Sequence, residues 1–473
     1  MLGWLPRWKK KDTDVPPLEE LGTLQHILED QAWAASLLLF AAVSAFFCAN
    51  WAYPIAGVPL SDWYTNFWQT GIGLAIESYT IAKPLHLWIN DGLMAIFFFF
   101  VGLEIKRELL IGELSNIRTA ILPIAGAVGG MVCPAVIFTL INWGTPEQHG
   151  WGIPMATDIA FCAGILGLFA KRIPHSVSVF LIALAIVDDL GAVLVIALFY
   201  TEGVKLVAFE AGVILILLSY TLSRLGVRSA VVFVLLFVLV WFVFLESGVH
   251  ATIAGVLFAF TIPLDNRYDR SLFVHRIMAL LHRFDEADTG ENPRMVNARQ
   301  QRVVRAIENE CIHVEAPLQR IENKLHPFVA FLIMPIFAFA NAGVPVDFAH
   351  VTELVFRPVT LGAFFGLLLG KQIGIFFSTY IAVRLGIGRK PEEMSWGHLY
   401  ALSWLAGIGF TMALFIAELA FAGGHGAAGD THTIPAHLVE AKIGILSASV
   451  VCAIVGAVLM AAVSRKPQAA AAH

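Results

Sequence analysis

Three aspartates and one lysine lie within apolar stretches of this sequence. Asp188 and Asp189 are adjacent inside the run 177–200, Asp158 lies in the run just upstream, and Lys371 lies in a run far downstream. Ionisable side chains are costly in hydrocarbon, so at that depth they mark an ion or proton pathway by default. Three acids and one base can balance one another and hold a small cation. These residue types therefore predict a buried cation or proton site.

The two adjacent aspartates cannot both face the same bound ion. Neighbouring side chains on a helix point about 100° apart, so we expect one carboxylate to face the cation and the other a partner. Lys371 is the base that could be this partner. Two interpretations stay open, a structural ion pair between Asp188 and Lys371, or a lysine that itself carries a transported proton.

The composition indicates the medium in which these charges lie. The chain has 473 residues, of which 58% are hydrophobic and 14% charged, and a mean hydropathy of +0.74. Soluble domains carry about 25% charged residues, so we predict a polytopic membrane protein. The net charge of −5 gives no indication of a nucleic-acid partner. The five cysteines show neither metal-ligand spacing nor a disulfide framework and are interpreted as small core residues.

A helix that crosses a bilayer needs about 20 apolar residues, and the sequence contains twelve candidate stretches. The predicted spans are Ala34–Trp51, Leu85–Leu103, Ala120–Ile141, Ile153–Phe169, Ser176–Tyr200, Leu206–Ser223, Ala230–Leu245, Gly248–Ile262, Phe328–Ala342, Thr360–Val383, Leu399–Phe421 and Val439–Val463. The seventh and eighth are the weakest. With the N-terminus inside, 26 of the 31 Lys and Arg residues fall in inner segments and at most Lys83, Lys205, Arg357 and Lys442 lie outside, which predicts that both termini are cytoplasmic.

The segments outside the spans define the expected organisation. Residues 1–33 are predicted to be a cytoplasmic N-terminal segment without the pattern of a cleavable signal peptide, 34–463 a twelve-helix membrane domain, and 464–473 a disordered cytoplasmic tail. The outer loop 53–83 has turn residues suited to a small hairpin. The charged inner insertion 265–324 has helical spacing in its second half (Met295, Val303, Ile307), typical of an amphipathic helix, although a solvated loop is an equal alternative.

Two predicted spans are interrupted by helix breakers. Residues 152–158 open the fourth span with Gly152 and Pro154 and then place Thr157 beside Asp158, and residues 407–411 interrupt the eleventh span with two glycines and a hydroxyl. Such breaks are tolerated only against protein or water, although a glycine in a membrane helix is often only a packing device.

The two interrupted spans occupy the second place in two three-span units, spans three to five and ten to twelve. Paired breaks of this kind point to the binding site of a transporter. Because each unit has an odd number of spans, inverted-topology repeats with two broken helices crossing at mid-membrane are geometrically possible. The facing half-helix ends expose N–H and carbonyl groups. We expect Asp158 to face the N–H ends and Lys371 to offset the carbonyl ends.

Long segments of the chain resemble one family. These are NDGLMAIFFFFVGLEIKREL, ATDIAFCAGILGL, LAIVDDLGAVLVIALFY, HPFVAFLIMPIFAFANAGV, GKQIGIF and LAGIGFTMALFIAELAF. They are similar to the NhaA-type sodium/proton antiporters of bacteria, and the resemblance covers residues 85–463. The inner insertion and the extended N-terminus depart from the family pattern.

The resemblance assigns roles to particular residues of this chain. It implies Na⁺-binding carboxylates at Asp158 and Asp189 with Thr157 beside them, and a proton-coupling or ion-paired Asp188 and Lys371. Further residues matched to the family are a cytoplasmic pH-responsive cluster (Glu104, Arg107, Glu108, Glu322 and His326) and two accessory positions (Asp91 and His250). From the residues alone, ordinary interfacial charge would explain that cluster, and a hydrogen-bonded core histidine would explain His250.

The resemblance also implies an activity. The expected protein is a transporter and not an enzyme, uses no cofactor, lies in the bacterial inner membrane, and forms a homodimer through its outer hairpin. It would exchange cytoplasmic Na⁺ or Li⁺ for external H⁺, electrogenically and under pH control. Two other classes of membrane protein can also place acids inside the membrane. An intramembrane aspartyl protease needs neither a lysine nor broken spans, and a cation channel needs a continuous pore.

Overall fold

The structure is a computed structural model, and it describes residues 23–55, 58–76, 79–201, 203–227, 230–264, 270–287, 297–314, 316–346, 349–421 and 435–464. The predictions for residues 1–22 and 465–473, and for parts of the inner insertion, fall outside the described residues.

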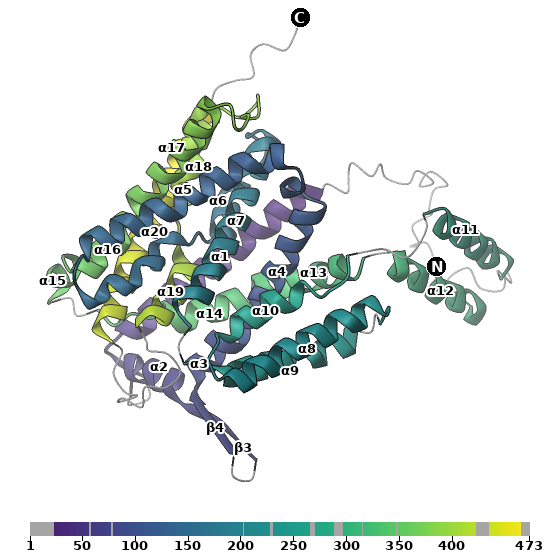
Figure 1. Ribbon diagram of the computed structural model, residues 1–473, viewed down its shortest axis with the longest axis horizontal. Helices are drawn as coiled ribbons and strands as arrows, with labels where there is room; N and C mark the ends of the chain where they lie inside the picture. The colour runs from purple at the N-terminus through teal and green to yellow at the C-terminus, as the bar shows by residue number, and fades with distance from the viewer. Residues whose placement is uncertain are drawn as a thin grey trace, which may run out of the picture.

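The described chain is almost entirely helical (Figure 1). The elements of the first half are α1 (Thr23–Asn50), β1 (Pro54–Ile55), β2 (Val58–Pro59), α2 (Leu60–Gln69), β3 (Gly71–Ile76), β4 (Tyr79–Pro84), α3 (Leu85–Trp88), η1 (Ile89–Leu93), α4 (Met94–Leu110), η2 (Glu113–Ser115), α5 (Ile117–Ile141), η3 (Pro146–Met155), α6 (Ile159–Gly167), α7 (His175–Phe199), α8 (Leu206–Arg224), α9 (Ala230–Ser247) and α10 (Ala251–Ala259).

The second half begins with the two helices of the insertion. Its elements are α11 (Arg270–Glu286), α12 (Ala298–Val314), α13 (Pro317–Phe328), η4 (Val329–Ile333), α14 (Met334–Asn341), α15 (Val351–Val355), α16 (Pro358–Phe365), η5 (Gly366–Gly370), α17 (Lys371–Arg384), α18 (Trp396–Leu405), α19 (Phe410–Phe421) and α20 (Ala436–Val463).

Nine helical segments of the described chain are long and apolar enough to cross a membrane, and a tenth is the bent pair α18 and α19. The protein is therefore a multi-pass membrane protein. The two remaining predicted spans correspond to α9 and α10, and α10 has only 9 residues. The chain turns between them at Gly248, whose φ of 80° lies in the left-handed region that favours glycine. The count of twelve and the inverted repeats stay predictions.

Three of the long spans contain a π-helical turn, a feature that often marks functional positions. The turns are η1 between α3 and α4, η4 between α13 and α14, and η5 between α16 and α17. The last of them ends at Gly370, so the widened turn comes directly before Lys371. Local backbone geometry therefore sets where that lysine leaves the helix.

Close backbone packing brings α17 against α5. A methyl group on Gly374 would overlap the carbonyl oxygen of Gly129, and one on Gly130 would come 2.7 Å from Ile375 Cγ1. Small residues allow membrane helices to approach at this distance. The packing places the first turn of α17, with Lys371, beside the middle of α5 (Figure 1).

The predicted outer loop and inner insertion both contain regular structure. Strands β1 and β2 pair antiparallel, as do β3 and β4 in a hairpin that extends from the bundle (Figure 1). In the insertion, α12 includes Val303 and Ile307, and Met295 lies outside the described residues. Helices α11 and α12 pack together beside the bundle, with Arg276 and Glu310 paired across them at 3.3 Å.

Candidate ion site

The breaks in the two interrupted spans meet in the structure. Helix α6 begins after Asp158, whose backbone is extended, and α18 and α19 are bent by 45° around residues 406–409. The amide of Asp158 donates to the carbonyl of Ile408 at 2.7 Å. The sequence-based expectation that the two breaks face each other agrees with this contact.

Asp158 caps two helices at once. Its Oδ1 accepts from the amide of Phe161 at 3.1 Å, in the first turn of α6. Its Oδ2 accepts from the amide of Thr411 at 3.0 Å and from the hydroxyl of Thr411 at 2.5 Å, in the first turn of α19. A carboxylate at a helix N-terminus satisfies free N–H groups and opposes the positive end of the helix dipole. Asp158 does so for both broken spans and is 1% exposed.

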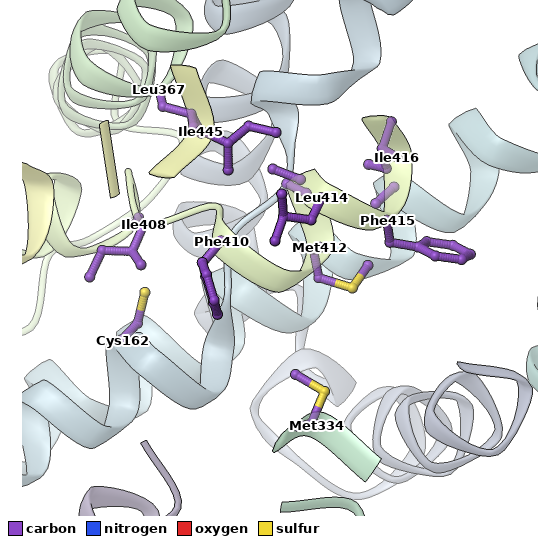
Figure 2. Close-up of a cluster of buried hydrophobic side chains, with 14 of the residues drawn as sticks. Cys162, Met334, Leu367, Ile408, Phe410, Met412, Leu414, Phe415, Ile416 and Ile445 are labelled. Carbon is purple, nitrogen blue, oxygen red and sulfur yellow. The ribbon is translucent and has the colours of Figure 1, made fainter. Parts of the chain in front are cut away.

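The carbonyl ends of the breaks have different partners from those predicted. The hydroxyl of Thr157 donates to the carbonyl of Ala406 at 2.9 Å, and the thiol of Cys162 donates to that of Leu405 at 2.9 Å. Figure 2 shows Cys162 directed from α6 towards the break at Ile408. These contacts do not support the prediction that Lys371 offsets the carbonyls. Thr157 and Cys162, from the first broken span, already donate to them.

Lys371 instead forms a fully buried ion pair with Asp188. Its Nζ lies 2.7 Å from Asp188 Oδ2, and both side chains are 0% exposed. Asp188 also interacts with Thr157, whereas Oδ1 of Asp189 is buried and has no hydrogen-bond partner within the described residues. The divergence of the two aspartates along α7 therefore appears as predicted, with one carboxylate on a partner and the other open.

The open oxygen of Asp189 lies in a charged but otherwise apolar interior. Asp189 interacts electrostatically with Asp188, Asp158, Glu104 and Lys371. The surrounding side chains form the main hydrophobic core, part of which Figure 2 shows around Phe410, Leu414 and Ile445. A buried carboxylate oxygen without a partner carries a large desolvation cost. A proton or a small cation would remove that cost, so the arrangement suits either one.

The predicted pH-responsive residues come together at the end of α4. Arg107 Nε lies 2.9 Å from Glu322 Oε1, and its guanidinium lies 3.0 Å from Glu108 Oε1. Glu104 interacts electrostatically with all three of these groups. His326 lies one turn after Glu322 on α13, with its ring 5.9 Å from that of Phe100. We call this set (Glu104, Arg107, Glu108, Glu322, His326) the Arg107 cluster.

Comparison with known proteins identifies the family. The model of the family described as Na+/H+ antiporter 1 matches residues 25–460, nearly the whole chain. The chain belongs to this family.

Several bacterial relatives of this antiporter family cover almost the whole chain. A protein of Saccharophagus degradans named Na(+)/H(+) antiporter NhaA 1 is 42% identical over 452 residues, 96% of this chain and 93% of its own. The Na(+)/H(+) antiporter NhaA of Oleidesulfovibrio alaskensis is 45% identical over 91% of each chain. One from Helicobacter pylori is 42% identical over 94% of this chain and 96% of its own.

The two accessory positions matched to the antiporter family lie away from the broken spans. Asp91 Oδ2 is 3.1 Å from Lys83 Nζ, so this pair connects η1 to the end of the β3–β4 hairpin. His250 is buried before the first turn of α10, and its Nε2 is 2.5 Å from the carbonyl of Tyr200. This contact agrees with the interpretation of His250 as a hydrogen-bonded core histidine.

Two features of the interior were missed from the sequence. Thr411, and not Thr157, supplies the hydroxyl that contacts Asp158; its position in the second break was the available signal. A second lysine, Lys442 on α20, is also buried. It is 5% exposed, and its Nζ lies 2.6 Å from Glu418 Oε1 on α19. The sequence pattern counts Lys442 at most among the outer charges, near the start of the predicted twelfth span.

Proposed function

We propose that this protein exchanges cytoplasmic Na⁺ or Li⁺ for external H⁺. One observation carries the proposal: the breaks of two membrane spans meet at Asp158, and this acid interacts electrostatically with Asp189, which has an open, buried oxygen. The names of the relatives, which are sodium/proton antiporters, support the same activity.

The cation and the proton compete for the same acids. Na⁺ is a hard cation and prefers oxygen ligands from carboxylates, hydroxyls and carbonyls. Asp158 and Asp189 supply carboxylates and Thr157 a hydroxyl, and each carboxylate can take a proton instead. A site that changes its exposure when it is loaded with either, but not when it is empty and charged, exchanges one for the other.

Asp188 and Lys371 have one of two roles in this cycle. Either Lys371 releases a transported proton when the cation arrives, or the pair only holds α7 against α17. Exchange is electrogenic if more than one proton moves for each sodium ion. Alternating access comes from two inverted repeats within twelve spans, which move around the broken helices. Net charge movement in proteoliposomes tests the electrogenic part directly.

The Arg107 cluster gives the exchanger its pH dependence. Three carboxylates around one guanidinium change their total charge as protons bind, and Glu104 interacts with both the cluster and Asp189. Glu322→Gln removes one partner of Arg107. We expect its pH–activity profile to shift relative to wild type at saturating Na⁺, and identical profiles would exclude the regulatory role.

The protein spans the bacterial inner membrane with both termini in the cytoplasm, and two copies associate through the β3–β4 hairpin. Reagents that cross only the outer membrane should label cysteines introduced in that hairpin but not in α11. Deletion of residues 71–84 should convert the dimer to a monomer in detergent. Labelling of α11 from outside, or a dimer that survives the deletion, would contradict these two parts.

Transport in proteoliposomes tests the central proposal. Wild-type protein should dissipate a pH gradient only after Na⁺ or Li⁺ is added, with saturable kinetics. Asp158→Asn and Asp189→Asn should each abolish this activity while the protein stays folded, because each removes negative charge from the site. Asp62→Asn, which changes an exposed acid on α2, is the matched control. Dissipation without added Na⁺, or near-normal exchange in both site variants, would refute the proposal.

A further inference from the structure

The carboxylate of Asp158 is occupied by donors from both broken spans. Two of the three are backbone amides, of Phe161 and Thr411, which have no lone pair to offer a cation. The third is the hydroxyl of Thr411, on Oδ2. These three donors use most of the roughly four lone-pair sites of the carboxylate, and the hydroxyl differs chemically from the two amides.

A hydroxyl oxygen can donate and accept at the same time. It carries one proton and two lone pairs, so Thr411 can keep its hydrogen bond to Asp158 and still bind a cation through its oxygen. A hydrogen bond to a carboxylate also polarises the hydroxyl and makes its oxygen more negative. The hydroxyl of Thr157 differs in that it does not contact Asp158: it donates to the neutral carbonyl of Ala406 at 2.9 Å, and Thr157 interacts with Asp188.

A second, independent observation points to a ligand in the same interior. Oδ1 of Asp189 is buried and has no hydrogen-bond partner within the described residues. Asp189 interacts electrostatically with Asp158, and Thr411 itself is 0% exposed. The interior therefore holds an open carboxylate oxygen on α7 and a polarised hydroxyl oxygen on α19, both of the ligand type that Na⁺ prefers.

We propose that the hydroxyl oxygen of Thr411 is a further direct ligand of the transported cation, and that its hydrogen bond to Asp158 couples this ligand to that carboxylate. This inference rests on the proposed exchange of Na⁺ for H⁺. It assigns one ligand to the second broken span, so that the bound cation joins α19 to α7. A threonine hydroxyl does not take up a proton near neutral pH, so the Thr411 ligand stabilises the bound cation without stabilising the proton that competes with it.

The test is Na⁺ binding to purified full-length Thr411→Val, measured by calorimetry in detergent, together with exchange in proteoliposomes. Valine keeps the shape of the side chain, and the backbone amide of residue 411 continues to cap Asp158. Loss of one contact of this strength corresponds to about a tenfold or larger increase in Kd. We expect the KM for Na⁺ to rise in parallel, with the maximal rate nearly unchanged. Thr411→Ser should restore both values to within about threefold of wild type.

The matched control is Thr379→Val, the same replacement at a buried threonine of α17 whose hydroxyl has no hydrogen-bond partner within the described residues. It should bind Na⁺ as wild type does. An unchanged Kd in Thr411→Val, with only a lower rate or stability, would show that Thr411 is merely structural. A lower Kd would show that its hydroxyl competes with the cation for Asp158. Either result overturns the inference, whereas a wild-type protein without Na⁺-dependent proton movement would instead refute the proposed function.

Discussion

Neutralising Asp188 should mainly affect stability and neutralising Asp189 should mainly affect Na⁺ binding, although the two residues are adjacent. In the structure the Lys371 side chain is 0% exposed and its ammonium lies 2.7 Å from the carboxylate of Asp188. Asp188→Asn removes that negative charge and leaves the buried ammonium without its partner. Removal of one member of a buried ion pair costs about 3–5 kcal/mol. Asp189→Asn instead neutralises a carboxylate with a buried oxygen that has no hydrogen-bond partner in the part of the chain that the structure describes. We therefore expect Asp188→Asn to lower stability and Asp189→Asn mainly to abolish Na⁺ binding.

The loss of stability can be converted into a change in melting temperature. With an unfolding entropy of about 2.1 cal/mol/K per residue, the 473 residues give about 1 kcal/mol/K. The cost of an unpaired Lys371 then corresponds to a fall in Tm of about 3–5 °C for Asp188→Asn. Thermal unfolding of purified protein in detergent measures it. The double variant Asp188→Asn with Lys371→Gln should recover most of the loss, because replacing both members of a buried pair is often nearly neutral.

The same variants separate the two roles of Lys371. If its amine carries a transported proton, Lys371→Gln should still exchange but should move less net charge for each sodium ion, as measured by the membrane potential in liposomes. If it is only the partner of Asp188, charge movement should be unchanged and Tm should fall. The reasoning about the pair is refuted if Asp188→Asn is as stable as wild type while Asp189→Asn is the less stable variant.

Two further predictions concern helix packing and the second buried pair. Gly374→Ala places a methyl group against the carbonyl of Gly129 and should lower stability by about 1–3 kcal/mol, whereas Gly92→Ala, whose methyl group would lie 3.7 Å from Trp241, should be nearly neutral in the same thermal assay. Glu418→Gln leaves Lys442 buried without its partner at 2.6 Å and should cost about 3–5 kcal/mol. The double replacement of Glu418 by Leu and Lys442 by Met should regain stability and keep Na⁺-dependent exchange; a double variant that is stable but inactive would mean that the pair takes part in transport.

Much of the site could be predicted from local features of the chain. Asp158, Asp188, Asp189 and Lys371 stand out because the cost of a charge in hydrocarbon depends on the side chain and on the apolar run around it. The different directions of Asp188 and Asp189 follow from the period of the helix. The breaks at 152–158 and 407–411 follow from glycine and proline. None of these deductions needs to know where another helix lies.

The partners of these groups were decided only by the tertiary structure. Asp188 and Lys371 are 183 residues apart, and Asp158 and Thr411 are 253 apart, so the pairing depends on which helix faces pack together. The sequence left the ion pair of Lys371 as one of two interpretations. It also counted Lys442 among the outer charges, because hydropathy cannot show that Glu418 lies opposite.

Sequence features act locally along the chain, whereas the contacts between buried groups depend on how distant helices pack, and this difference explains what the sequence could not determine. Composition, periodicity and helix breakers act over a few residues, and together they determined that this chain spans a membrane, where it is interrupted and which charges are buried. Which donor reaches which acceptor is set by close helix approaches such as that of Gly374 to Gly129, and an error of a few ångströms there exchanges one partner for another. The tertiary structure alone therefore decided that Asp158 joins the two broken spans through Thr411 while Asp189 is left open.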